Sequence, residues 1–360
     1  LQGDDVSSGD RVAATGKHFL GYGSPVSGRD RTPVWIPERY LREYFLPPFW
    51  NAIDQAQLRS IMVNPAETNG IPLHANHSIL TLLLREQIGF GGVVVSDWTA
   101  IESLHTIHRV APDMKEAVRL AIDAGIDIAM VPGDYRFAEH LIELVKEGII
   151  PEARIDVSVR SILNLKADLG LFYDSYPPAD GMTVYDDEST AALSLQAARE
   201  SLVLLKNDGV LPLAEGTRIL LTGPGCRSLP ALHGPWSYTP QGADPAAYPA
   251  ELETVLQAFQ DGQPPEEITF VPGAGFDYLV DLDRAVRAAQ RVDVIECVLA
   301  ETPGAGDLGN LALPSAQAEL VKALSFGKPL IVVLLENRPR LVTETDSFAN
   351  AVLFASHPGP

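Results

Sequence analysis

The stretch Gly91-Gly92-Val93-Val94-Val95-Ser96-Asp97-Trp98 decides the fold, because an apolar run ends there in a carboxylate and an indole. Strands that are buried on both faces of a parallel sheet are nearly continuous in Val, Ile and Leu, and the residues up to Val95 fit that pattern. Folds of the α/β class keep their chemistry at the carboxyl ends of such strands. Asp97 is therefore the first candidate for a catalytic residue. The structural alternative is a cap on the next helix, through Asp97 or Thr99.

From residue 1 to about residue 172, short apolar runs alternate with longer amphipathic stretches, which predicts βα units around a parallel sheet. Strands are expected near 11–16, 60–64, 92–96 and 126–131. Helices are expected near 38–56, 77–88, 113–123, 136–147 and 154–168. A complete (β/α)₈ barrel needs eight units and about 250 residues. The pattern therefore predicts the C-terminal half of a (β/α)₈ barrel in residues 1–172.

A second domain is predicted after a linker at 173–190, where prolines and acidic residues interrupt the periodicity. Ser194 to Leu205 is expected to be a helix followed by a strand. Further strands are expected near 218–222, 267–271, 293–299, 329–335 and 350–355, with helices near 250–261, 282–291 and 315–326. Strands separated by helices indicate a doubly wound α/β sandwich domain over residues 191–360.

The charge and the cysteine count limit the function classes. The chain has 27 basic and 47 acidic residues, a formal net charge of −20, which makes nucleic acid and anionic membrane poor partners. Cys226 and Cys297 are too few for a disulfide framework and lack metal-ligand spacing. His105 and His108 share a helical spacing, but we expect them on the solvated surface. We expect no cofactor and no metal, and a periplasmic or secreted location.

Several motifs, taken in order, resemble family 3 glycoside hydrolases, the β-glucosidase and β-xylosidase group. They cover nearly the whole chain, and the ordered set is far more specific than any one of them. The matching stretches are Lys17–Gly23, Asn69–Asn76, Ser96–Trp98, Gly125–Pro132, Arg154–Asp156, Ala198–Asn207 and Gly327–Pro329. The resemblance implies the same two-domain plan, and it implies that the first half of the barrel and the end of the second domain are not in this chain.

The resemblance also implies the two carboxylates that glycoside hydrolysis needs. Asp97 would be the nucleophile of a retaining mechanism, forming a covalent glycosyl-enzyme. The general acid and base would be Glu301, in Glu301-Thr302-Pro303-Gly304, although the loop around it is shorter than in the family. Glu296 is a second candidate, and a solvated loop glutamate is the alternative for Glu301.

Further residues would hold the sugar. In the family, the pair that matches Lys17 and His18 donates hydrogen bonds to sugar hydroxyls; the alternative is a Lys that neutralises Asp97 beside a packed His. Trp98 and Trp236 match aromatic walls, with core packing as the alternative. Arg31 lies in a polar loop that resembles one branch of the family, where it would line the cleft or pair with its neighbours. Glu67 is a cleft residue by resemblance to the same branch.

The sequence thus predicts a retaining, exo-acting β-glycosidase, a β-glucosidase or β-xylosidase acting on β-linked oligosaccharides or glycosides. Within the family, a β-N-acetylhexosaminidase is the alternative, although that group favours Gly-His-Gly where this chain has Gly21-Tyr22-Gly23. Outside it, the alternative is an inactive fragment or a non-catalytic carbohydrate-binding relic. Open sheet edges in a half-barrel lead us to expect little activity from residues 1–360 alone, and a homodimer.

Overall fold

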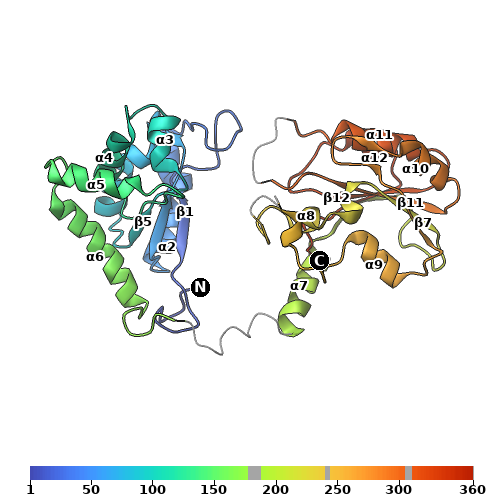
Figure 1. The fold of residues 1–360 in the computed structure, drawn as a ribbon, viewed down its shortest axis with the longest axis horizontal. Helices are drawn as coiled ribbons and strands as arrows, with labels where there is room; N and C mark the ends of the chain where they lie inside the picture. The colour runs from blue at the N-terminus through green and yellow to red at the C-terminus, as the bar shows by residue number, and fades with distance from the viewer. Residues whose placement is uncertain (177–187, 240–243, 305–309, 360) are drawn as a thin grey trace. The chain divides into compact units, whose positions relative to one another are not determined.

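The computed structural model describes residues 1–176, 188–239, 244–304 and 310–359. The chain divides into two compact units, Leu1–Thr183 and Val184–Pro360 (Figure 1). Of the predicted linker at 173–190, residues 177–187 lie outside the described residues. Helix α7 (Glu188–Ser201) begins within the last three residues of this predicted linker.

The sheet of the first unit has three parallel strands in the order β1-β2-β5, which are β1 (Thr15–Phe19), β2 (Ser60–Val63) and β5 (Val93–Val95). Their registers place Ser60 beside both Thr15 and Val93. A hairpin with two residues in each strand, β3 (Glu67–Thr68) and β4 (Ile71–Pro72), follows β2. These parallel strands place the residues that follow Phe19, Val63 and Val95 at one edge of the sheet.

The strand expected at 126–131 is reduced to one parallel bridge, between Ile128 and Val95. Backbone hydrogen bonds flank the bridge, from the Asp127 N–H to the Val94 carbonyl and from the Thr99 N–H to the Met130 carbonyl, and two side chains add to them. The Asp127 carboxylate accepts the Val94 N–H at 2.9 Å, and the Ser96 hydroxyl accepts the Met130 N–H at 2.7 Å. The described residues of the first unit therefore show three paired strands and this bridge, and the half-barrel stays a prediction.

Helices surround this sheet, and their apolar faces form one core with it. The core includes Phe19, Ile61, Leu80, Leu104 and Ile122. The helices are α1 (Glu38–Tyr40), η1 (Leu41–Phe45), α2 (Leu46–Asp54), η2 (Leu73–Ala75), η3 (Ser78–Gln87), α3 (Ala100–Thr106), α4 (Met114–Ala124), α5 (Arg136–Lys146) and α6 (Glu152–Asp168). The sequence marks both ends of α4. The Asp113 side chain caps its first turn, and Gly125 ends it with a φ of 119°.

The second unit contains a six-stranded mixed sheet in the order β6-β13-β12-β11-β7-β8. The strands are β6 (Val203–Asn207), β7 (Ile219–Thr222), β8 (Ile268–Phe270), β11 (Val294–Ala300), β12 (Leu330–Leu335) and β13 (Ala351–Phe354). Five are parallel, and β6 pairs antiparallel with β13 at one edge. A small hairpin, β9 (Gly273–Ala274) and β10 (Leu279–Val280), stands apart.

Both faces of this sheet are covered. Figure 1 shows α10, α11 and α12 on one side of it and α8 and α9 on the other. The side chains of β11 alternate accordingly: Cys297 and Leu299 belong to the core under α10 and α11, whereas Val298 belongs to the core under α8 and α9. The remaining helices are η5 (Pro224–Arg227), α8 (Leu229–His233), η6 (Pro245–Ala247), α9 (Val255–Gly262), α10 (Leu282–Ala289), α11 (Ser315–Leu324) and α12 (Thr343–Asp346).

No helix among the described residues is both long and apolar enough to cross a membrane.

Candidate active site

Asp97 lies two residues beyond β5, at the carboxyl edge of the sheet, and is only 4% exposed. It does not cap the next helix. Helix α3 begins after Thr99 with no side-chain cap, and the Thr99 hydroxyl donates instead to the Trp98 carbonyl at 2.7 Å. The structural alternative for Asp97 is thereby removed, and its carboxylate is directed at other groups.

Three donors surround the Asp97 carboxylate. Oδ1 accepts the Trp98 N–H at 2.7 Å and lies 2.9 Å from Nη2 of Arg31, while Oδ2 lies 3.2 Å from Nε2 of His18. Burial by itself would raise the pKa of Asp97, but the hydrogen bond from His18 and the charge of Arg31 outweigh it and lower that pKa. The group is therefore a carboxylate at neutral pH, as a nucleophile must be.

Arg31 is itself held by its neighbours. The Asp30 carboxylate accepts the Arg31 N–H at 2.9 Å and also the hydroxyl hydrogen of Tyr22. The Tyr22 ring packs on His18 with centroids 4.6 Å apart, and its pKa is raised by burial and by the bond to Asp30. Arg31 thus pairs with its neighbour Asp30, as one alternative predicted, and it also contacts Asp97; its place in a sugar-binding cleft stays a prediction.

The other predicted sugar-binding residues on this unit are open to solvent. Lys17 is exposed at the end of β1, and Trp98 is 55% exposed beside Asp97. Core packing is therefore not the role of Trp98. Trp236, on the second unit, is 74% exposed, and the same holds for it.

Glu67 takes part in a pair that the sequence does not reveal. Its Oε1 lies 2.9 Å from Nδ1 of His108, whose side chain is only 7% exposed. The expectation that His108 is solvated is therefore wrong, because a carboxylate from β3 covers it. A second histidine that was not predicted, His74, is 1% exposed and accepts the Asp97 N–H at 3.0 Å.

Glu301 follows β11 on the second unit and is 3% exposed. Its Oε1 accepts the Asn337 N–H at 2.5 Å, and its Oε2 lies 2.6 Å from Arg340 and 3.3 Å from Arg338. The solvated loop glutamate is thereby excluded. Two guanidinium groups therefore make charge-assisted pairs with the Glu301 side chain.

Glu296, the second candidate for the acid, lies in the middle of β11, between Leu221 and Ile331 of the neighbouring strands. It is 8% exposed, and burial raises its pKa to about 7. A position inside the strand keeps it away from the carboxyl edge, where Glu301 lies. Its place in the fold therefore does not suit a group that must reach a substrate.

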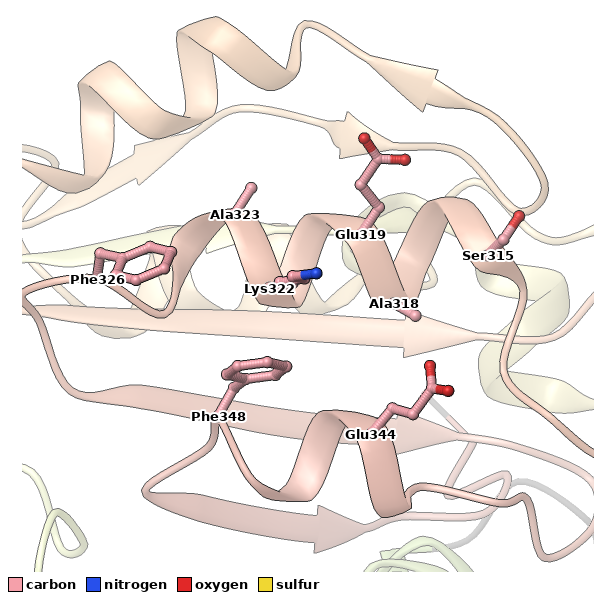
Figure 2. A pocket seen from close by; sticks show the side chains of 8 residues that line it. All are labelled: Ser315, Ala318, Glu319, Lys322, Ala323, Phe326, Glu344 and Phe348. Carbon is pink, nitrogen blue, oxygen red and sulfur yellow. The ribbon is translucent and has the colours of Figure 1, made fainter.

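Two hollows lie on the second unit. One, of about 610 Å³, is lined by Glu301 together with Asp277, Thr302 and Arg340. The other, of about 570 Å³, runs between α11 and α12 and is lined by Glu319, Lys322, Phe326 and Glu344 (Figure 2). Only the first contains a residue predicted for the site. Among the described residues, no group of three or more His, Cys, Asp or Glu is arranged to hold a metal ion.

Two family models match the chain. The model described as "Glycosyl hydrolase family 3 N terminal domain" matches residues 1–165, and that described as "Glycosyl hydrolase family 3 C-terminal domain" matches residues 202–360. The chain belongs to glycosyl hydrolase family 3. The family resemblance stated from the motifs is confirmed.

Two relatives from the curated proteins agree with this family. The "Lysosomal beta glucosidase" of Dictyostelium discoideum is 40% identical over 97% of the chain and 44% of its own length. The "Periplasmic beta-glucosidase" of Salmonella typhimurium is 32% identical over 98% of the chain and 49% of its own length. The chain spans about half the length of the curated family 3 relatives it matches.

Solved structures give the same picture. A β-glucosidase from Listeria innocua superposes with a TM-score of 0.85 at 30% identity, covering 99% of the chain and 49% of that protein. The same enzyme in complex with isofagomine gives 0.84 at 31% identity, covering 99% of the chain and 50% of that protein. These similarities support the α/β fold of this family 3 chain.

Proposed function

We propose that the protein containing this chain is a retaining, exo-acting β-glycosidase, a β-glucosidase or a β-xylosidase. The observation that carries the proposal is the Asp97 carboxylate, which is buried at a strand end and faces His18 and Arg31. The names of the relatives support the substrate class, since they include β-glucosidases and a β-xylosidase. They do not favour the β-N-acetylhexosaminidase or the relic.

In the proposed reaction, an Asp97 oxygen attacks the anomeric carbon as the glycosidic C–O bond breaks, and the leaving oxygen takes a proton from a general acid. Water then attacks the glycosyl-enzyme, gives a proton back to the same group, and releases Asp97 as a carboxylate. His18 and Arg31 stabilise that carboxylate as it leaves. Lys17, Trp98 and Trp236 are proposed to bind the sugar, and Glu67 to line the cleft.

Glu301 remains the candidate for the general acid and base that was predicted from the sequence. Its ion pairs must be considered in that role. A general acid must be free to reach the leaving oxygen, but Arg338 and Arg340 already contact the Glu301 side chain. The ion pairs would have to open before Glu301 could act. The same contacts support a second role, in which Glu301 anchors the loop after β12 to the end of β11.

The test is made on the complete natural protein. It should hydrolyse aryl β-glucosides or β-xylosides, and a slow fluorinated glycoside should label Asp97 covalently, as peptide mass spectrometry would show. Labelling of another carboxylate would overturn the assignment of Asp97. NMR would monitor the anomeric configuration of the sugar released in the first turnovers. A product with inverted configuration would overturn the retaining mechanism.

We propose a periplasmic or secreted location as well. The supporting observation is that one relative is named as periplasmic and another as lysosomal. Fractionation of the source cells with an antibody to this chain tests it, and recovery with cytosolic markers alone would contradict it.

A further inference from the structure

His74 lies in η2, between the hairpin β3–β4 and helix η3, and its ring is buried at the level where β2 and β5 end. The ring contacts the backbone of the residues that follow these two strands. The Asp97 N–H donates to its Nε2 at 3.0 Å, and a further hydrogen bond joins the ring to the backbone of Asn64. One imidazole therefore connects the residue after β2 with the proposed nucleophile after β5.

The direction of these bonds determines the tautomer. A peptide N–H can only donate, so Nε2 must be the unprotonated nitrogen and the ring proton must lie on Nδ1. The bond to the Asn64 backbone raises the pKa of His74, as donation from a ring N–H to a carbonyl does. Burial is the larger effect and lowers this pKa to about 3. The ring is thus a neutral acceptor toward Asp97 at any pH near neutrality.

The strand ends explain why such an acceptor is needed. β2 and β5 pair only as far as Met62 and Val95. Beyond that rung the strands separate: the Asn64 N–H donates to Phe19 on one side, and the Ser96 N–H donates to Ile128 on the other. Among the described residues, no carbonyl of a neighbouring strand accepts the Asp97 N–H. A buried N–H without an acceptor is destabilising, so an acceptor at this position favours the observed orientation of the peptide.

We propose that His74 is a positioning residue for Asp97, which accepts the Asp97 N–H and so fixes the peptide from which the nucleophilic carboxylate projects. The inference rests on the proposed function of Asp97. The carboxylate is bonded to the very next N–H, that of Trp98, so a rotation of the Asp97 peptide would carry Oδ1 and Oδ2 away from Arg31 and His18. Misplacement by about 1 Å can lower a rate about 100-fold.

Two substitutions separate positioning from packing. In H74Q, the side-chain amide oxygen can take the place of Nε2 as acceptor, whereas H74L keeps bulk but no acceptor. We expect H74L to lose about 10- to 100-fold in kcat with KM changed less than about threefold. We expect H74Q to restore kcat to within about threefold of wild type.

The control is H105L. His105 makes a comparable ring-to-backbone bond, from Nδ1 to the Ala111 carbonyl at 3.0 Å, but has no bond to Asp97. We expect H105L to lower Tm about as much as H74L while leaving kcat unchanged. An H74L variant with wild-type kcat, or an H74Q variant as slow as H74L, would overturn the inference.

A measurement without turnover decides the inference even if the variants fail to fold. In the wild-type protein labelled with ¹⁵N, we expect a scalar coupling across the hydrogen bond between the Asp97 amide nitrogen and His74 Nε2, and no titration of His74 between pH 5 and pH 8. A proton found on Nε2 would refute it. Absence of wild-type turnover would count against the proposed function, while this coupling would still decide the role of His74.

Discussion

Nη2 of Arg31 lies 2.9 Å from Oδ1 of Asp97, although 66 positions separate the two residues in sequence. The pair joins a polar loop after β1 to the end of β5. The Arg31 side chain is 44% exposed, whereas that of Asp97 is 6% exposed. The positive charge beside the proposed nucleophile is therefore reachable from solvent, and a bound sugar would share that side of Asp97 with it.

Substituting Arg31 is expected to change the pH dependence of the enzyme. Arg31 is one of the groups that lower the pKa of Asp97, so R31Q should raise that pKa. The acid limb of kcat/KM reports the ionisation of the free enzyme, and we expect it to move to higher pH. The exposed Arg39, which pairs with Glu43 four residues further along in η1, supplies the control R39Q. Identical acid limbs for R31Q and R39Q would contradict the assigned role of the pair.

Substituting Asp97 itself is expected to abolish glycosyl-enzyme formation. D97N keeps the shape of the side chain but not its nucleophilicity, so kcat on aryl β-glycosides should fall by several orders of magnitude. The matched control is D113N at the N-cap of α4, which changes an aspartate whose side chain accepts the Glu116 N–H. It should cost about 1 kcal/mol or less in stability and leave kcat unchanged. Near-normal turnover by D97N would eliminate the nucleophile assignment.

Leaving-group dependence separates the two roles of Glu301. If it is the general acid, E301A should slow hydrolysis of disaccharides far more than that of activated aryl glycosides, and azide should partly restore the latter. If it only anchors the loop, both substrates should lose the same factor and Tm should fall. The matched variant R340Q removes the 2.6 Å partner of Glu301 and should reproduce the loss of Tm in either case. Equal losses on both substrates would transfer the acid role to another residue.

Removing Asp127 is expected to destabilise the first unit. Its side chain is 2% exposed and accepts hydrogen bonds from Arg85 at 2.5 Å, Ser158 at 2.6 Å and the Val94 N–H at 2.9 Å. D127A would remove the acceptor of Ser158 and of the Val94 N–H, and would leave Arg85 without its buried carboxylate, although Arg85 Nη1 still donates to the Phe90 and Gly92 carbonyls. Breaking such a buried pair costs about 3–5 kcal/mol in the free energy of unfolding. The control D123A breaks only the surface pair with Arg119, worth about 1 kcal/mol or less. Denaturant titration measures the free energy of unfolding of both variants. Equal decreases would show that the buried network stabilises the fold no more than the surface pair does.

Glu336 is expected to weaken the fold as the pH rises. It is fully buried, its Oε1 has no hydrogen-bond partner, and burial raises its pKa to about 7 despite the pair with Arg340. Between its ordinary pKa near 4.5 and about 7 the folded state binds more protons than the unfolded state, so stability falls with rising pH in that window. E336Q should flatten this slope, measured as Tm at pH 5 and pH 8. An unchanged slope would mean that Glu336 titrates normally.

Local signals account for the elements that the sequence predicted well. The helix expected at 113–123 is found at Met114–Ala124 because Asp113 and Gly125 mark its ends. The strand expected at 60–64 is found at Ser60–Val63. The hairpin β3–β4 was missed because strands of two residues are too short to show alternation. The antiparallel edge strand β6 was predicted as a strand, but its direction depends on a partner, β13, that lies far away in sequence.

In the candidate site, too, the residues in local motifs were predicted, whereas the contacts between distant segments were not. Asp97, His18 and Arg31 were predicted, and the structure brings their side chains together. The partners of Glu301 were not predicted, because Arg338 and Arg340 follow β12 and meet Glu301 only when β11 and β12 pair. The bond from Asp97 to His74 likewise joins two elements, and no spacing in the chain indicates it.

The unequal exposure of Arg31 and His18 makes the proposed nucleophile partly sensitive to ionic strength. Mobile ions screen a charge that is open to water, with a Debye length of about 8 Å in physiological salt and about 3 Å in 1 M salt. The Arg31–Asp97 distance of 2.9 Å is well inside the Debye length of physiological salt, so the Arg31 contribution should weaken only in about 1 M salt, and more than the contribution of the less exposed His18. The protein thus holds Asp97 ionised by one interaction that depends on the surrounding medium and one that is largely independent of it.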